Sequence, residues 1–394
     1  MWIARKAEET LSRMLGQFPA VILTGARQRG KTSLARRVLP QAAYVTLDLP
    51  SQAARAEQTP ADFLGSHGDP FIIDEVQYAP SLFRFLKVAI DQDRRPGRFL
   101  LTGSQIFPLM QGVSESLAGR CGILDLQGLS VPELEAAGLA TAEDDLLFRG
   151  TFPELQARRE TDPALWYTAY VATYLERDVR NILQVGNLRD FERLLRAAAA
   201  RVGGLLSYAE LARDVGIAPN TARQWISVLE ASGQIQLLEP YHRNLGKRLV
   251  KTPKLYFRDL GLAIFLLGFT SWQAVIRHPV VGALWENHVV MEVVRHFAGL
   301  GLAKPLWFWR TAQGEEVDLL VEEGGRFVAI EAKFTEQPEP AAAKGMAALT
   351  RLYGPASVTQ AVVACRTPQA YPLAAGGTAV PGSRIGALLA GEPV

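Results

Sequence analysis

The chain has 394 residues, of which 48% are hydrophobic and 21% are charged. This length exceeds what one hydrophobic core usually spans, so two or three domains are expected, and the composition excludes a largely disordered protein. A formal net charge of +2 excludes a global electrostatic pull toward nucleic acid or an anionic membrane, so any basic surface must be local.

The two cysteines, Cys121 and Cys365, lie far apart in the sequence and lack the spacing of metal ligands. They favour two ordinary buried thiols in a reducing cytoplasm over a disulfide-built secreted domain. Residues 1–15 are charged and helical in pattern, without the apolar core of a signal peptide, and apolar runs such as 261–269 are too short to span a bilayer. A cytoplasmic protein without a membrane partner is expected.

A phosphate-binding motif follows the first apolar strand, which is predicted over 20–24. Residues 25–33, GARQRGKTS, match the pattern G-x-x-x-x-G-K-[ST], and an amphipathic helix is predicted over 33–39. A strand that leads in and a helix that leads out are the context in which such a loop cradles phosphates. The sequence therefore predicts a P-loop that binds ATP with magnesium.

The residue types in this loop match the chemistry of a nucleotide site. Gly25 and Gly30 let the backbone wrap around the phosphates. Lys31 is expected to reach the outer phosphates, and Thr32 is expected to ligate magnesium. The residues expected to bind the nucleotide are Gly25, Ala26, Arg27, Gln28, Arg29, Gly30, Lys31, Thr32 and Ser33.

An acidic pair ends the next predicted strand, PFIIDEVQ (70–77). This is the pattern of a Walker B strand. Asp74 is expected to hold the magnesium through water, and Glu75 to orient and polarise the attacking water as general base.

Polar residues also end the strand predicted over 98–105. Ser104 is the first candidate for a sensor of the nucleotide, and Thr102 is the second. A helix is predicted over 107–117. Arg120 follows it, where an arginine finger would neutralise transition-state charge on a neighbouring subunit's nucleotide, and an arginine without that role is the alternative.

Residues 20–130 resemble an AAA+ ATPase core. The wider pattern is similar to a prokaryotic family of AAA-type ATPases of uncharacterised function, which join this core to a winged helix and a C-terminal domain like the PD-(D/E)XK nucleases. The resemblance extends to about residue 366. It rests on GARQRGKTS, FIIDEVQ, LLTGSQ, SLAGR, FRGTFPE, YLERDV and KTPKLYFRDLGLA, with the C-terminal motifs given below. The family commonly has two glycines where this chain has Arg149 and Gly150, so no role is carried over to Arg149.

Residues after this core predict helices of a lid or connector, and Arg177 lies in one of them. It is expected either to contact nucleotide or to form a surface salt bridge. The pattern of residues 206–241 is two short amphipathic helices, a glycine turn at Gly216, and then a strand, which is typical of a winged helix. Four apolar residues are expected to pack the two helices together: Leu211, Val215, Ile226 and Leu229.

The second of these helices would present polar residues to a groove or a partner, namely Asn220, Arg223, Gln224 and Trp225. A basic run without acidic residues follows: Arg243, Lys247, Arg248, Lys251, Lys254 and Arg258. Such a ribbon suits contacts with the phosphates of DNA or RNA. The alternative is a winged helix used only for packing, beside a solvated basic hairpin.

The last part of the chain predicts a helix over 283–297 that carries Glu286 near its start. Three strands, a helix and a further strand follow, over 307–310, 314–323, 326–334, 341–353 and 359–364. From Arg366 onward, a loosely packed tail rich in Gly, Pro and Ala is expected.

Asp318 lies on the second of these strands, and Glu331 and Lys333 lie on the third. Because residues i and i+2 of a strand share a face, Glu331 and Lys333 are expected to project together toward Asp318. This arrangement resembles the PD-(D/E)XK nuclease core, with Glu286 as the upstream acid. The resemblance implies that Glu286, Asp318 and Glu331 hold magnesium or manganese and that Lys333 positions or activates water at a phosphodiester.

The sequence thus predicts an α/β protein with a parallel-sheet AAA+ core over 1–135, a helical lid over 136–200, a winged helix-turn-helix over 201–265 and a restriction-endonuclease-like domain over 266–394. The expected function is ATP hydrolysis that controls action on DNA, with metal-dependent DNA cleavage possible. The alternative is a regulatory or signalling ATPase whose winged helix binds DNA or protein and whose nuclease-like domain is silent. Assembly into a homo-oligomer is left open.

Overall fold

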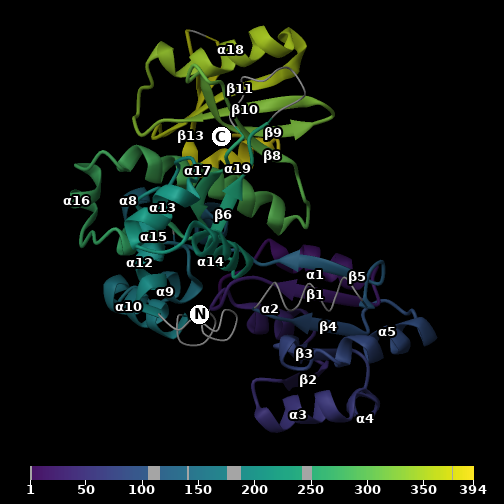
Figure 1. Ribbon diagram of the computed structural model, residues 1–394. Helices are drawn as coiled ribbons and strands as arrows, with labels where there is room; N and C mark the ends of the chain where they lie inside the picture. Colours follow the sequence, from purple (N-terminus) through teal and green to yellow (C-terminus); the bar gives the residue numbers. More distant parts are fainter. Residues whose placement is uncertain (1, 105–115, 140–141, 175–187, 242–250, 375) are drawn as a thin grey trace.

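The computed structural model describes residues 2–104, 116–139, 142–174, 188–241, 251–374 and 376–394 (Figure 1). Arg177 and the basic residues Arg243, Lys247 and Arg248 lie outside the described residues, as does most of the helix expected over 107–117.

The first part of the chain is built around a parallel sheet of five strands in the order β2-β3-β4-β1-β5, at the lower right of Figure 1. The strands are β1 (Ala20–Thr24), β2 (Ala43–Thr46), β3 (Phe71–Asp74), β4 (Phe99–Thr102) and β5 (Cys121–Asp125). Every residue of β1, β3 and β4 is buried, as expected for parallel strands covered on both faces. The predicted α/β fold with a parallel sheet is confirmed.

Helices cover both faces of this sheet because side chains alternate along each strand. Val21 and Leu23 of β1 pack on one face, with Leu11 and Leu34 from the helices there. Ile22 packs on the other face, in a cluster with residues of α4 and α5. The helical elements of this part of the chain are α1 (Ala7–Leu15), α2 (Lys31–Val38), α3 (Pro50–Gln58), α4 (Pro60–Gly65), η1 (Val76–Tyr78), α5 (Leu82–Gln92) and α7 (Val131–Ala136), the last of which packs outside the sheet.

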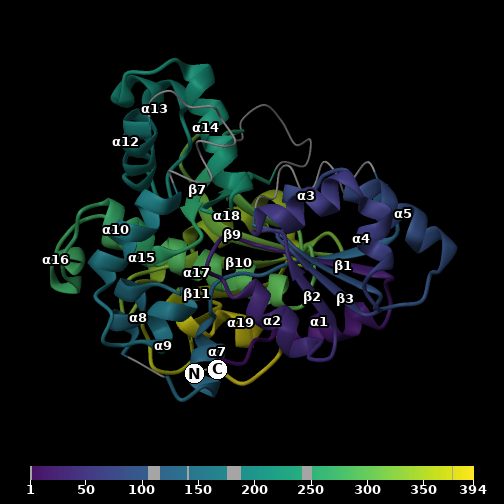
Figure 2. The same cartoon turned by 90° about the horizontal axis from the view of Figure 1, so that it is seen from below.

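A helical region with one two-stranded sheet follows. Its elements are α8 (Glu143–Arg149), α9 (Pro153–Ala157), α10 (Pro163–Tyr174), α12 (Leu188–Ala199), α13 (Tyr208–Val215), α14 (Pro219–Ala231), β6 (Ile235–Leu238), β7 (Lys254–Phe257), α15 (Leu260–Leu266) and α16 (Trp272–Ile276). Gly216 ends α13 with a φ of 83°, a left-handed conformation that glycine adopts without strain. Figure 2 shows α12, α13 and α14 projecting from the rest of the molecule. The four apolar residues expected to pack the two helices together are all buried in one cluster.

The last part of the chain is a six-stranded mixed sheet in the order β12-β13-β11-β10-β9-β8, at the top of Figure 1. Its strands are β8 (Leu306–Arg310), β9 (Glu316–Glu323), β10 (Arg326–Ala332), β11 (Val358–Cys365), β12 (Tyr371–Pro372) and β13 (Thr378–Pro381). The helical elements are α17 (Val281–Gly299), η3 (Pro340–Ala343), α18 (Lys344–Tyr353), η4 (Pro355–Ser357), η5 (Gly382–Arg384) and α19 (Ile385–Leu389). Trp285 of α17 and Met346 of α18 belong to separate apolar clusters that share this sheet, so both of its faces are covered.

The expectation of a loosely packed tail after Arg366 is wrong. Strand β13 pairs in parallel with β11, and Val380 and Ile385 are completely buried. A Cβ on Gly382 would lie 2.4 Å from the ring of Trp285, so the chain passes directly over that side chain. Small residues in this tail permit close packing. Among the described residues, none of the helices is long and apolar enough to cross a membrane.

Replacing Ile385 by alanine should therefore destabilise the protein, because it leaves a cavity between α19 and the sheet. The expected loss is about 2–5 kcal/mol of unfolding free energy, measured by urea denaturation. Ile276→Ala is the matched control, since Ile276 is 41% exposed, and it should change stability by less than about 0.5 kcal/mol. Equal effects of the two substitutions would show that the tail is not packed.

Candidate functional site

The P-loop leaves the carboxyl end of β1 in a conformation that requires its glycines. Gly25 has a φ of 135°, and a Cβ there would lie 2.4 Å from the carbonyl oxygen of Leu126. Gly30 has a φ of 87° and precedes the first turn of α2. The backbone amides at the start of α2 therefore border the loop, which is the arrangement that binds anions.

Lys31 is the first residue of α2, and its side chain turns back into the P-loop. Its ammonium group donates to the carbonyl oxygens of Gly25, at 2.9 Å, and Ala26, at 3.0 Å. Burial lowers the pKa of Lys31 to about 8, although the nearby carboxylate of Glu75 acts in the opposite direction. Because an anion stabilises the charged form of a buried lysine, phosphate in this loop would favour the ammonium ion.

Asp74, at the end of β3, accepts hydrogen bonds from three hydroxyl groups on three different elements. Thr32 of α2 and Tyr44 of β2 each donate to it at 2.9 Å, and Thr102 of β4 donates as well. A carboxylate beside a threonine hydroxyl offers the oxygen ligands that Mg²⁺ prefers. Thr32 and Asp74 therefore fit the magnesium that the motif implies.

Glu75 follows Asp74 with a φ of 56°, a left-handed conformation that is uncommon for a residue with a side chain. Ser104 donates to its carboxylate at 3.0 Å, and Gln77 donates to the same oxygen. Burial raises the pKa of Glu75, but the charge of Lys31 and the hydrogen bonds from Gln77 and Ser104 bring it below its ordinary value. Glu75 is thus held as a carboxylate beside the P-loop.

A cavity of about 430 Å³ lies between the P-loop and Glu75. One of its walls comes from Thr173, near the end of α10 in the helical region. Ala26 is buried beside Gly233 of that same region instead of lining the cavity. The lining residues are Arg27, Gln28, Gly30, Lys31, Thr32, Ser33, Glu75 and Thr173.

Arg120 lies away from this cavity. Arg120 precedes β5, whose first residue, Cys121, is aligned with Ala20 at the start of β1. Arg120 therefore lies at the amino-terminal ends of the strands, whereas the P-loop lies at their carboxyl ends. Its guanidinium group donates to both carboxylate oxygens of Asp91, at 2.8 and 3.0 Å. Arg120 therefore does not reach the nucleotide site of its own chain, and a role on a second copy stays a prediction.

The acidic residues of the C-terminal domain lie close together, as the sequence predicts. Asp318 of β9 accepts a hydrogen bond from the backbone of Ala332 on β10 at 3.0 Å, and Lys333 pairs with Glu331 at 2.7 Å. Burial, together with the charge of Asp318, raises the pKa of Glu331 to about 8 and that of Glu286 to about 7.

Lys254 belongs to this acidic cluster, contrary to expectation. Its side chain is 3% exposed, and its ammonium group lies 2.7 Å from Glu286 and 3.4 Å from Asp318. Arg258 is also engaged within the protein, with Asp125 at 2.8 Å. The prediction of a basic ribbon suited to phosphate contacts is therefore wrong at Lys254 and Arg258, because carboxylates of the protein itself pair with both. Lys251 is exposed.

The outer face of α14 is polar. Asn220, Arg223 and Gln224 are exposed, as expected. Trp225 is not, because it is 7% exposed and its ring packs 5.3 Å from that of Phe191. Trp225 holds α14 against α12 and does not face a partner.

Comparison with known proteins divides the chain into three matched segments. Residues 17–135 match an AAA domain, and residues 141–273 and 281–385 match two domains of unknown function, DUF8612 and DUF4143. Two relatives, the uncharacterized proteins Mb2031c of Mycobacterium bovis and Rv2008c of Mycobacterium tuberculosis, are each 38% identical over 337 residues, which is 85% of this chain and 74% of theirs. The chain belongs to their family and is a P-loop AAA-type ATPase.

Among solved structures, the Walker-type ATPase PABY2304 of Pyrococcus abyssi is similar at 15% identity and a TM-score of 0.44, over 66% of this chain and 94% of that one. This likeness is too weak to carry an argument.

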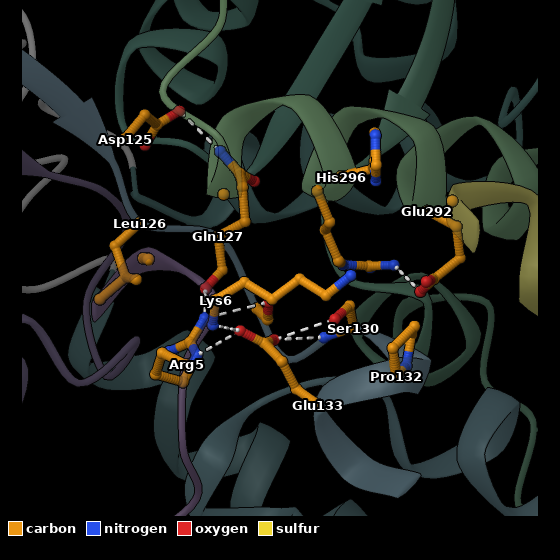
Figure 3. A pocket seen from close by; sticks show the side chains of 15 residues that line it. Arg5, Lys6, Asp125, Leu126, Gln127, Ser130, Pro132, Glu133, Glu292 and His296 are labelled. Carbon is orange, nitrogen blue, oxygen red and sulfur yellow. Dashed lines mark hydrogen bonds and ion pairs between the residues drawn. The ribbon is translucent and has the colours of Figure 1, made fainter. Parts of the chain in front are cut away.

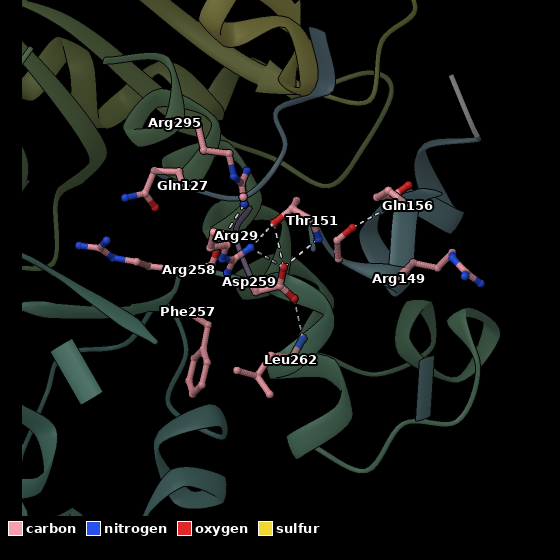
Figure 4. A network of polar contacts seen from close by, with 12 residues as sticks. Arg29, Gln127, Arg149, Thr151, Gln156, Phe257, Arg258, Asp259, Leu262 and Arg295 are labelled. Carbon is pink, nitrogen blue, oxygen red and sulfur yellow. Dashed lines mark hydrogen bonds and ion pairs between the residues drawn. The ribbon is translucent and has the colours of Figure 1, made fainter. Parts of the chain in front are cut away.

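Within the ATPase, Arg29 has a position that the sequence did not suggest. Its side chain is 3% exposed and points into the helical region, so only the backbone of Arg29 is left to border the nucleotide cavity. Its guanidinium group lies 3.5 Å from a carboxylate oxygen of Asp259 (Figure 4). The same group lies 3.9 Å from the ring centre of Phe152. Burial acts to lower the pKa of Arg29, so the buried guanidinium ion requires the counter-charge of Asp259.

Asp259 holds several elements around this ion pair. One oxygen accepts from the backbone and the hydroxyl of Thr151, each at 2.8 Å. The other accepts from Tyr167 at 2.6 Å and from the backbone of Leu262, at the start of α15, at 3.0 Å. Burial raises the pKa of Asp259, but Arg29 and these donors bring it below its ordinary value.

Arg5, in the segment before α1, forms hydrogen bonds that hold the P-loop (Figure 3). It donates to the carbonyl oxygen of Arg29 at 3.0 Å and to that of Gln127 at 2.7 Å. Its charge is met by Glu133, at 3.2 Å, which also accepts from the backbone of Ser130. The backbone and the side chain of Arg29 are therefore held by different parts of the ATPase.

Sequence reasoning missed Tyr44, Thr173 and Asp259, and it misplaced Lys254. Asp259 lies in a segment that carries the family resemblance, so a signal was present, although its partner was not evident. Lys254 and Tyr256 share a face of β7 and both contact Glu286, so strand alternation was the available clue.

Asp259→Asn should destabilise the ATPase strongly, because it leaves the Arg29 charge buried without a counter-charge. The expected loss is about 3–5 kcal/mol of unfolding free energy, measured by urea denaturation. Asp214→Asn removes a carboxylate that is 43% exposed, and it should cost less than about 0.5 kcal/mol. If the two variants were equally stable, the ion pair would not hold the loop.

Proposed function

We propose that this ATPase is a nucleotide-driven switch that acts on DNA. Hydrolysis in the P-loop moves the helical region, which contains a winged helix, and the nuclease-like C-terminal domain relative to the core. The observation that carries the proposal is the buried Arg29–Asp259 pair, since it ties a residue of the P-loop directly to the helical region.

The catalytic roles follow from the contacts around the cavity. Lys31 neutralises charge on the outer phosphates, and Glu75, held as a carboxylate, accepts the proton of the attacking water. Thr32 and Asp74 would hold magnesium, which supplies positive charge to the phosphates when it is bound. Ser104 and Gln77 keep the Glu75 carboxylate in place, so Ser104 acts on the water-activating residue.

Glu75→Gln should lower ATP turnover by about 10²–10⁴-fold while leaving ATP binding intact, because the amide cannot accept the proton. Lys31→Ala should abolish binding. Turnover is measured as phosphate release, and binding with a fluorescent ATP analogue. The matched control is Glu57→Gln, an exposed glutamate in the same domain, which should retain full turnover. Full turnover in Glu75→Gln would rule out its role as the base.

The buried Arg29–Asp259 pair transmits movement of the P-loop to the helical region, because its two charges resist separation. A shift of the loop on binding or losing phosphate carries Arg29 with it, and separating two buried charges is costly. Asp259, and with it the start of α15, must follow. Thr173 gives the helical region a second contact with the same cavity.

DNA is the proposed partner because of the exposed face of α14. Arg223 supplies exposed positive charge on this helix, and Asn220 and Gln224 supply hydrogen-bonding groups on it. Lys251, three residues before β7, is a further exposed cation. Helices of this type enter the major groove, while neighbouring basic residues contact phosphates. RNA offers the same phosphate chemistry and is the competing ligand.

Arg223→Ala and Lys251→Ala should each weaken DNA binding, and each should reduce the slope of log K against log salt by about 1, as expected for one lost phosphate contact. Fluorescence anisotropy with a labelled duplex at several salt concentrations measures both quantities. Arg277→Ala removes an exposed arginine outside this face and should leave binding unchanged. An equal loss in all three variants would indicate nonspecific charge attraction. A labelled RNA duplex in the same assay tests the alternative.

A second candidate is a regulatory ATPase whose nuclease-like domain is catalytically silent and whose winged helix binds DNA or protein. One observation favours a C-terminal domain without nuclease activity: Lys254 lies inside the acidic cluster. Metal-dependent DNA cleavage that is lost in Lys333→Ala would instead support a nuclease.

A further inference from the structure

The resemblance to PD-(D/E)XK nucleases implies a divalent metal held by Glu286, Asp318 and Glu331. Most of the carboxylate oxygens that would ligate it are engaged within the protein. One oxygen of Asp318 accepts from the backbone of Ala332, and the other faces Lys254. One oxygen of Glu286 accepts from both Lys254, at 2.7 Å, and Tyr256, at 2.5 Å. Within the part of the chain that the structure describes, no group of three acidic, histidine or cysteine side chains is arranged to hold a metal.

Lys254 occupies the place between these carboxylates. It contacts a third acid, Glu316, besides Glu286 and Asp318. The ammonium ion therefore satisfies the acids as a metal cation would.

With every acid ionised, the formal charges of the cluster are already nearly balanced. Four carboxylates lie here, on Glu286, Glu316, Asp318 and Glu331. Three cationic side chains pair with them, on Lys254, Arg310 and Lys333. A divalent ion added between Glu286 and Asp318 would lie next to the ammonium group of Lys254. The two positive charges would repel strongly there, because the dielectric constant is low.

We propose that the ammonium group of Lys254 replaces the divalent cation, so the C-terminal domain of this ATPase holds no metal at the cluster and does not cleave DNA as the nucleases it resembles do. The acids instead fix β7, and thereby the helical region, to the C-terminal domain. This inference rests on the cluster alone and does not depend on ATP hydrolysis or on DNA binding.

The acids of the cluster can be reached from solvent. A cavity of about 660 Å³ opens beside the cluster and is lined by Glu316, Glu331 and Lys333, among others. One oxygen of Glu331 is buried there and has no hydrogen-bond partner among the described residues. A metal ion from solution can therefore reach the acids, and its binding is a fair test.

The experiment measures Mn²⁺ binding to the full chain by electron paramagnetic resonance, without nucleotide. Lys254→Met should bind one more Mn²⁺ ion per chain than the natural protein, because the acids lose their internal cation. The double variant Lys254→Met, Asp318→Asn should lose that ion again. Any Mn²⁺ at the P-loop is common to all samples and cancels. Lys304→Met is the control, since Lys304 pairs with a single exposed carboxylate, Glu323, and it should gain no ion.

A cooperative unfolding transition in urea shows that each variant is folded. An absence of ATP turnover in the natural protein would contradict the proposed function and leave this inference unaffected. A folded Lys254→Met that gains no Mn²⁺ overturns the proposal. If that variant does not fold, the natural protein is compared with Asp318→Asn. Equal Mn²⁺ binding supports the internal cation, and loss of an ion in Asp318→Asn shows that the cluster binds metal despite Lys254.

Discussion

The pairing of Arg29 with Asp259 joins the phosphate-binding loop to the region that follows the core. The two charges are almost completely removed from solvent, at 3% and 1% exposure, so neither is tolerable without the other. Phe152 covers the guanidinium group, and Thr151 and Tyr167 complete the hydrogen bonds of the carboxylate. The arrangement of the core and the helical region therefore depends on one ion pair. Its loss would leave an unpaired buried charge either in the core or in the helical region.

A different solution to the same electrostatic problem appears in the C-terminal domain. Acidic side chains lie together there because β9 and β10 are neighbours and α17 brings a third acid to their edge. Buried carboxylates need a counter-charge, and the chain supplies it from a lysine that comes before the domain in the sequence. Both buried clusters thus join segments that the sequence comparison assigns to separate domains.

Local patterns made much of this predictable. The glycines of the P-loop, the acids that end β3 and the alternation of Glu331 with Lys333 each depend on spacing within a few residues, so the sequence alone indicated them. The partners of Arg29 and Lys254 could not be found in this way, because they depend on contacts between distant segments. A basic residue in a loop or on a strand has the same appearance in the sequence whether it faces solvent or a buried carboxylate, and only the packing decides between them.

The segment from Lys254 to Asp259 contacts all three parts of the ATPase. Lys254 reaches the acids of the C-terminal domain, Arg258 reaches Asp125 of the core sheet, and Asp259 reaches the P-loop. Inserting or deleting one residue here would turn each side chain toward the wrong neighbour. The length of this segment should therefore be invariant during evolution. For the same reason, its domains cannot be exchanged between relatives as independent cassettes unless these six residues and their partners are transferred together.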